Sequence, residues 1–210
     1  MEILKFDDKK SVELVKSGEV IAFPTETVYG LGVRYDSLVA FNRLVEIKNR
    51  PKNKAFTLMI SSVNEIKKYA IVDKKIERIC NKYMPGPLTV ILKARSDVPA
   101  HAKSIDQTIG IRCPDLKKLR DFIHGLAPDF IDNVGVPLLV PSANKSGASP
   151  CKSAEEIINT FDNEISALID EKVKKSDLPS TIIDLSELGK IKLIREGGIE
   201  FKELEETYER

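Results

Sequence analysis

The sequence has 210 residues, of which 42% are hydrophobic and 31% are charged, so its composition is that of an ordinary globular protein. Its 33 Lys and Arg residues nearly balance its 32 Asp and Glu residues, which leaves no overall charge to draw the chain onto nucleic acid or an anionic membrane. A chain of this length buries roughly 70% of its unfolded surface, and we expect a single domain over residues 1–210.

Cysteine usage and hydropathy favour a cytoplasmic location. Cys80, Cys113 and Cys151 are far apart and form no CxxC pair, which suits a reducing compartment better than a disulfide framework. The first ten residues lack the layout of a signal peptide, and no apolar stretch reaches the ~20 residues of a membrane helix. We therefore expect neither export nor contact with a membrane.

Short apolar runs alternate with helical patterns through the first part of the chain. Gly18 is placed to end the first helix in a left-handed conformation, and Asp36 is the expected cap of the second. Ser62 and Glu65 have the spacing of a capping box. The patterns predict helices at 7–17, 36–47 and 73–83, and strands at 19–23, 55–60 and 88–93.

The alternation continues to the end of the chain. Ser153, followed three residues later by Glu156, is the expected start of another helix, and the acidic stretch 201–210 reads as a solvated helix or a fraying tail. The stretch 125–136 is a candidate long loop. Strands are predicted at 108–112, 137–140, 166–170, 180–185 and 190–195, and helices at 115–124 and 153–161. The fold class is therefore α/β (α+β), with a mixed sheet and flanking helices.

Two polar loops follow predicted strands. "PTETVYGLG" (24–32) offers hydroxyls, a carboxylate and two glycines that permit close backbone approach or positive φ, and "PSANKSG" (141–147) offers hydroxyls, an amide and flexible backbone. Ligands in open α/β sheets bind outside the carboxyl ends of strands, so we expect both loops to border one crevice. The alternative is that each loop is an ordinary turn whose hydroxyls cap a helix.

Cations also gather at the ends of predicted elements. Lys48 and Arg50 leave the second helix just before Pro51, whose restricted backbone turns them into an extended path where both could face a polyphosphate. Arg112 and Arg195 each end a strand. The alternative interpretation is that these are solvated surface charges.

Several catalytic patterns are missing from the sequence. His101 and His124 lie outside any HExxH or GxSxG motif, and neither a P-loop nor a GxGxxG fingerprint occurs. An enzyme with this sequence would work by positioning and electrostatics, as in phosphoryl and nucleotidyl transfer, with Mg²⁺ carried on the nucleotide.

Taken together, the motifs resemble those of the YrdC family, the threonylcarbamoyl-AMP synthases. The segments that carry the resemblance, from about residue 10 to 200, are "FPTETVYGLG", "KNRP", "PGPLTVIL", "TIGIRCPD", "PLLVPSANKSGASP", "STIIDL" and "LIREGG". The resemblance implies a twisted mixed sheet around a concave basic cleft. It also implies condensation of L-threonine, bicarbonate or CO₂ and ATP into threonylcarbamoyl-adenylate and pyrophosphate, which partner proteins then use to modify tRNA.

The resemblance further implies roles for individual residues. Lys48 and Arg50 would act on the phosphate oxygens, where charge develops, and would be the catalytic pair. Thr25, Tyr29 and Arg112 would bind threonine, with Arg112 on its carboxylate. The other residues implied in nucleotide binding are Thr108, Ser142, Asn144, Ser149, Ser180, Thr181 and Arg195.

Two other functions compete with this interpretation. A basic cleft could hold tRNA or double-stranded RNA without catalysis, which predicts a steep dependence of affinity on salt. A carbamoyl-transfer domain of the hydrogenase-maturation type would share the fold, but the zinc-finger-like segments of that type are absent from this sequence. A purely structural role would leave the clustered polar loops unexplained.

Overall fold

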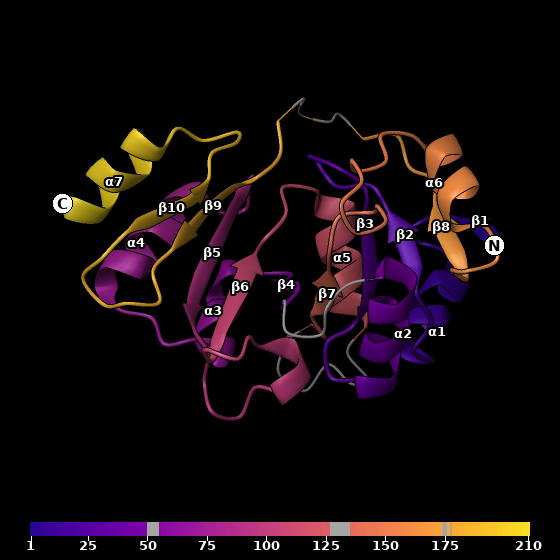
Figure 1. Ribbon diagram of the computed structural model, residues 1–210, viewed down its shortest axis with the longest axis horizontal. Coiled ribbons are helices and arrows are strands. Elements are labelled where there is room, and N and C mark those ends of the chain that lie inside the picture. The colour runs from indigo at the N-terminus through magenta and orange to yellow at the C-terminus, as the bar shows by residue number, and fades with distance from the viewer. Residues whose placement is uncertain (50–54, 127–134, 174–175, 177) are drawn as a thin grey trace.

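The computed structural model describes residues 1–49, 55–126, 135–173, 176 and 178–210, and within them ten strands form one sheet (Figure 1). The order of strands is β1-β8-β2-β3-β7-β4-β6-β5-β9-β10. The strands are β1 Glu2–Leu4, β2 Ile21–Phe23, β3 Gly30–Arg34, β4 Thr57–Met59, β5 Leu88–Lys93, β6 Thr108–Arg112, β7 Leu138–Val140, β8 Ala167–Ile169, β9 Thr181–Asp184 and β10 Lys192–Arg195. Parallel and antiparallel pairs alternate irregularly, which confirms the predicted mixed sheet.

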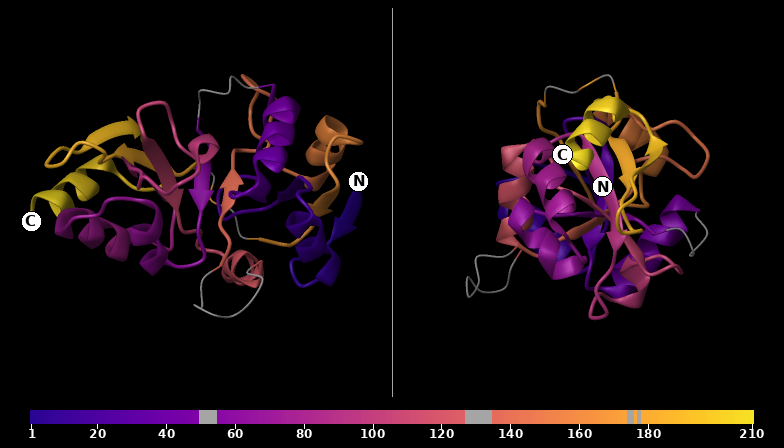
Figure 2. Two further views of the ribbon diagram at one scale, coloured as in Figure 1. Left: turned by 90° about the horizontal axis from the view of Figure 1, so that it is seen from below. Right: turned by 90° about the vertical axis from the view of Figure 1, so that its left-hand side faces the viewer.

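Helices cover both faces of this sheet (Figure 2). They are α1 Lys9–Lys16, α2 Leu38–Lys48, α3 Ile66–Tyr69, α4 Lys74–Tyr83, α5 Lys117–Gly125, α6 Ala154–Phe161 and α7 Phe201–Glu209, with 3₁₀ turns η1 Val63–Glu65 and η2 Ala100–Ala102. In the described residues no helix combines the length and hydropathy needed to cross a bilayer. The candidate loop at 125–136 falls mostly on 127–134, outside the described residues.

The alternation of β2 divides the core between the two faces. Val20 and Ala22 pack into a cluster that includes side chains of α2 and α6, whereas Ile21 and Phe23 pack into a second cluster with α1 and α5. Successive strand residues point to opposite faces, so a strand buried on both sides reads as a continuous apolar run. Burial of each of the larger side chains, Val20, Ile21 and Phe23, stabilises the fold by about 1.5–3 kcal/mol.

Strand β3 was not predicted, because its glycines were assigned to a loop. A Cβ on Gly32 would lie 2.3 Å from the Phe23 ring, and one on Gly30 would lie 2.6 Å from Cγ1 of Val140. Both glycines therefore allow the close approach of neighbouring side chains, and neither adopts positive φ. Strand β1, at the edge of the sheet, was also missed.

The predicted cap of α2 is wrong by one residue. Ser37 is the cap, and its side chain accepts a hydrogen bond from the backbone N of Ala40. Asp36 instead forms a two-point ion pair with Arg34, which lowers the pKa of the carboxyl through that hydrogen bond. Two charge-assisted hydrogen bonds from a guanidinium stabilise a carboxylate more than one hydrogen bond from a backbone N–H does.

The predicted capping box of Ser62 and Glu65 is also wrong. Ser62 makes no capping hydrogen bond, and Glu65 accepts from the hydroxyl of Ser61 instead. Other end signals are confirmed. Gly18 has φ +87° after α1, and Ser153 accepts from the backbone N of Glu156 at the start of α6.

The C-terminal helix α7 is part of the core rather than a solvated tail. It packs on α4, with Leu204 and Tyr208 fully buried. The hydroxyl of Tyr83 donates to the carbonyl of Glu203, and Lys82 Nζ donates to Thr207 Oγ1. Leu204 and Tyr208 are four residues apart and lie on one face of the helix, but the acidic residues around them led to the prediction of a solvated tail.

Candidate functional site: a hydroxyl-lined cavity

A cavity of about 480 Å³ lies along the consecutive strands from β3 to β10. That volume falls within the range of small-molecule sites. Thr25, from the loop after β2, and Ser142, from the loop after β7, both line it. The expectation that the two polar loops border one crevice is confirmed.

The loop after β2 is ordered by its own hydroxyls. Thr25 and Thr27 are 2% and 3% exposed, and Thr25 Oγ1 donates to the carbonyl of Val28 at 2.7 Å. Because that bond uses the only hydrogen of Thr25 Oγ1, the hydroxyl of Thr27, 3.0 Å away, donates to it. Thr27 Oγ1 is therefore left to accept hydrogen bonds from elsewhere.

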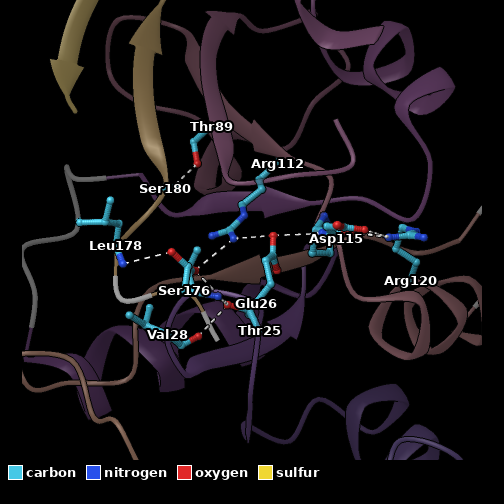
Figure 3. Close-up of polar contacts among 12 residues, drawn as sticks. Thr25, Glu26, Val28, Thr89, Arg112, Asp115, Arg120, Ser176, Leu178 and Ser180 are labelled. Atoms are coloured by element: carbon cyan, nitrogen blue, oxygen red, sulfur yellow. Dashed lines mark hydrogen bonds and ion pairs between the residues drawn. The ribbon is translucent and has the colours of Figure 1, made fainter. Parts of the chain in front are cut away.

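Arg112, at the end of β6, supplies the donor to this loop (Figure 3). Its Nη2 donates to Thr27 Oγ1 at 3.0 Å and to Glu26 Oε1 at 2.7 Å. The two side chains of the ion pair are 8% and 13% exposed. Arg112 Nε and Glu26 Oε2 are buried and have no hydrogen-bond partner among the described residues.

The loop after β7 is organised around Asn144. Ser142 Oγ donates to Asn144 Oδ1 at 2.6 Å, and Lys48 Nζ donates to the same oxygen at 2.8 Å. Lys48 Nζ also donates to the carbonyls of Ser142 and Asn144. Lys48 is 2% exposed, so the structure places its ammonium group behind the loop and not among the lining residues.

Arg195, at the end of β10, contacts the start of β9. Its Nε and Nη2 donate to the carbonyl of Ser180 at 3.1 and 2.8 Å, and Nη2 also donates to Ser180 Oγ. The hydroxyl of Thr89 lies 3.1 Å from Ser180 Oγ (Figure 3). Burial lowers the pKa of Arg195, and the charge of Arg112 lowers it further. The two guanidinium groups therefore influence each other within one cavity.

Tyr29 and Thr108 also line the cavity. Burial raises the pKa of Tyr29, and the charge of Asp170 adds to the effect, so the phenol stays neutral. Thr108 Oγ1 lies 2.8 Å from Ser104 Oγ, a second hydroxyl of the lining. Met59, at the end of β4, adds apolar surface.

The structure brings seven of the predicted site residues to the cavity: Thr25, Tyr29, Thr108, Arg112, Ser142, Ser180 and Arg195. Asn144 lies just behind Ser142, as does Lys48. Ser149 is exposed and does not line the cavity. Arg50 lies outside the described residues.

Thr181 was predicted as a cleft hydroxyl and points elsewhere. It is fully buried, and its hydroxyl donates to the carbonyl of Ile199 and accepts from the backbone N of Gly197 and Ile199. Ser180, one residue earlier, lines the cavity. Neighbouring strand residues face opposite sides, so a "ST" pair can place only one hydroxyl in the site.

Sequence reasoning missed several hydroxyls of the lining. Thr57 and Thr89 sit inside strands, where threonine is common for its β propensity, so nothing marked them as functional. Ser104 precedes β6 in a polar turn. For Thr27, its place in the same polar loop as Thr25, two residues further on, was a usable signal.

The charges of the lining indicate the class of ligand. In the described part of the lining, the charged side chains are Arg112 and Arg195, and no carboxylate is present. The described residues contain no group of three or more His, Cys, Asp and Glu that could hold a metal ion. Fold and site together define a mixed α/β protein with a cleft across its sheet whose charges suit a polar, anionic small molecule.

The chain belongs to the Sua5/YciO/YrdC family, described as telomere recombination, whose sequence profile matches residues 13–197. A threonylcarbamoyl-AMP synthase of Pyrococcus abyssi is 32% identical over 194 residues, 92% of this chain and 54% of that protein. One of Vibrio vulnificus is 30% identical over 177 residues, 82% of this chain and 90% of that protein. The chain thus spans about half of the first relative and most of the second.

Solved structures agree in fold. Pyrococcus abyssi Sua5 complexed with L-threonine superposes with a TM-score of 0.86 and 28% identity, over 99% of this chain and 61% of that one. Escherichia coli YciO superposes with a TM-score of 0.82 and 27% identity, over 96% and 97%. The twisted mixed sheet with flanking helices expected from the family resemblance is confirmed.

Proposed function

We propose that this protein is a threonylcarbamoyl-AMP synthase, which condenses L-threonine, bicarbonate or CO₂ and ATP into threonylcarbamoyl-adenylate and pyrophosphate. The observation that carries the proposal is the single cavity that joins Arg112 and the loop of Thr25 with Ser142 and Arg195. The relatives that share the family are named for this activity, and one related structure is a complex with L-threonine.

The chemistry needs positioned charge rather than an enzyme nucleophile. The threonine amine adds to CO₂ and loses a proton, which gives a carbamate. A carbamate oxygen then bonds to the α-phosphorus of ATP while the bond to the bridging oxygen of the β-phosphate breaks, and pyrophosphate leaves. Holding the two reactants side by side supplies much of the rate enhancement.

We assign the threonine end of the cavity to Arg112, whose planar fork suits a carboxylate. Thr25 is committed to hydrogen bonds within its loop, so it would order this end rather than bind the substrate hydroxyl directly. Tyr29 would form the wall. The contacts of Arg112 and Thr25 support these assignments.

We assign the nucleotide to Ser142, Ser180, Thr108 and Arg195, with Mg²⁺ entering as part of the ATP substrate. Lys48 and Arg50 stay the proposed cations for the phosphates. Lys48 already holds the carbonyls of the 142–144 loop, so its proposed role includes fixing that loop where the phosphates bind.

We further propose that the product passes, in the cytoplasm, to proteins that modify tRNA. A non-catalytic tRNA-binding or double-stranded-RNA-binding role is the alternative. It predicts salt-steep RNA affinity without pyrophosphate release.

The test is pyrophosphate release from Mg-ATP, measured with and without L-threonine and with and without bicarbonate. We expect release only when all three substrates are present, with the adenylate detected by mass spectrometry. L-Serine, which lacks the methyl group, serves as the matched control substrate. Release that is independent of threonine, or RNA binding without any release, would contradict the proposal.

A further inference from the structure

The carboxylate of the "TET" segment lies behind Arg112 rather than in the cavity. Arg112 lines the cavity, whereas Glu26 does not. Glu26 Oε1 accepts from Arg112 Nη2 at 2.7 Å and from the backbone N of Asp115 at 3.0 Å (Figure 3). The carboxylate thus joins the loop after β2 to the segment after β6.

Both hydrogens of Arg112 Nη2 are used on the same loop. One is donated to Glu26 and the other to Thr27 Oγ1, which in turn donates a hydrogen bond to Thr25 Oγ1. A guanidinium held at two points on one nitrogen cannot rotate about its Cζ–Nε bond without breaking both hydrogen bonds. The donors at Nε and Nη1 make no hydrogen bond to any described residue, and they keep a fixed direction.

Glu26 also balances the charge of this end of the cavity. The charge of Arg112 acts on Arg195, whose pKa it lowers after the larger effect of burial. With Glu26 removed, the two guanidinium groups would face one cavity, and Arg112 would lose the carboxylate with which it is in contact. A carboxylate in contact with Arg112 limits that repulsion.

We infer that Glu26 is a positioning residue that fixes the guanidinium of Arg112 for an α-carboxylate, and so sets the affinity for the amino-acid substrate. The identity of that substrate rests on the proposed function. The restraint of Arg112 by Glu26 does not depend on the proposed function.

The test compares Glu26→Gln with a matched control. Gln keeps the length and an oxygen for the backbone N of Asp115, but it removes the negative charge. Glu171→Gln is the control, because Glu171 has the same 13% side-chain exposure, forms an ion pair with Lys118 at 3.0 Å and lies outside the cavity lining. Circular dichroism verifies the fold of both variants.

Guanidinium ¹H–¹⁵N spectra provide the readout that needs no ligand. The Arg112 signals, identified by their loss in Arg112→Lys, are expected to show slow rotation in the wild-type protein and in Glu171→Gln. In Glu26→Gln we expect fast rotation and broadening. Fast rotation of Arg112 in the wild-type protein would overturn the inference even if Glu26→Gln failed to fold.

Calorimetric titration provides the second readout. Loss of the charge is expected to weaken L-threonine binding about tenfold while ATP affinity changes less than about twofold, because hydrogen bonds to a charged partner are roughly twice as strong as neutral ones. Unchanged threonine affinity in Glu26→Gln would overturn the inference. If the wild-type protein bound no threonine, the proposed function would fail, whereas the spectra would still decide whether Glu26 restrains Arg112.

Discussion

Arg112 and Arg195 face the same cavity, but the two guanidinium groups have different hydrogen-bond partners. Arg112 is paired with the carboxylate of Glu26. Arg195 donates only to the carbonyl and the hydroxyl of Ser180 among the described residues, and these acceptors are neutral. One end of the cavity is therefore nearly balanced in charge, and the other keeps a net positive charge.

This difference suits two different ligands. A zwitterionic amino acid needs a directed donor for its carboxylate but no excess positive charge, which would repel its ammonium group. A polyphosphate gains from an unbalanced cation, since the attraction at 4 Å reaches about 4 kcal/mol at an effective dielectric constant of 20. The contrast supports placing threonine near Arg112 and ATP near Arg195.

Breaking the balanced pair should have the largest effect. Arg112→Ala leaves the carboxylate of Glu26 buried without its cation, and such changes cost about 3–5 kcal/mol. We expect urea denaturation to show this loss in the free energy of unfolding, together with loss of threonine-dependent pyrophosphate release.

A double-mutant cycle provides the control for that change. Arg112→Ala combined with Glu26→Ala removes both charges, so we expect it to recover part of the stability lost in Arg112→Ala alone. Purely additive losses would show that the pair is not energetically coupled, and the contrast with Arg195 would fail.

Removing Lys48 should have the next largest effect, because the 142–144 loop depends on it. Lys48→Ala removes the ammonium donor from the carbonyls of Ser142 and Asn144, and we expect kcat/KM for pyrophosphate release to fall at least ~10²-fold. Lys82→Ala is the matched control, since Lys82 also lies at the end of a helix and donates to a neutral oxygen, but its partner is Thr207 of α7 and not the 142–144 loop. Equal rates in the two variants would contradict the role of Lys48.

Most of the strands, and the meeting of the two loops, could be predicted because they depend on local signals. Apolar runs gave the buried strands, and the polar residues directly after them gave the loops of Thr25 and Ser142. The direction of individual side chains could not be predicted. Thr181 faces away from the cavity because of its place in the strand, and Lys48 points behind the loop because of contacts about 95 residues away in sequence.

Glycine and acidic patterns misled the prediction for a related reason. Gly30 and Gly32 were interpreted as turn residues, but they lie in β3. Glycine is needed at both positions, since Val140 and Phe23 leave no room for a Cβ. The acidic C-terminus read as solvated, although Leu204 and Tyr208 anchor α7 on α4. Val140 and α4, which contact Gly30 and α7, are both distant in sequence.

Replacing Arg195 should separate its role from that of Arg112. Arg195→Gln loses hydrogen bonds to neutral acceptors but leaves no buried carboxylate without its cation, so we expect a smaller loss of stability than in Arg112→Ala. We expect ATP affinity to fall about tenfold and threonine affinity to stay within about twofold, measured by calorimetry. If Arg195→Gln lowered the affinity for threonine more than the affinity for ATP, the assignment of the two ends would be reversed.

Glu65 shows what a buried carboxylate costs without an arginine, and its effect should be the smallest. It accepts from the hydroxyl of Ser61, while its Oε2 is buried without a partner among the described residues. Burial raises the pKa of Glu65, and the hydroxyl of Ser61 and the charge of Lys68 only partly oppose this effect. Glu26 differs because Arg112 compensates its charge.

The sign of the pH dependence follows from that shift. Because the pKa of Glu65 is higher in the folded state, its favourable contribution is fully present below its unfolded pKa and is lost as pH rises through the folded pKa. Glu65→Gln stays neutral, so the unfolding free energy of the wild-type protein relative to this variant should fall as pH rises above about 4.5, by about 1.4 kcal/mol for each unit of the shift. Urea titrations at several pH values measure this difference, with the exposed Glu206→Gln as control. If this difference in unfolding free energy stayed constant or rose with pH, the charge of Glu65 would be stabilised in the folded state, as the charge of Glu26 is by Arg112.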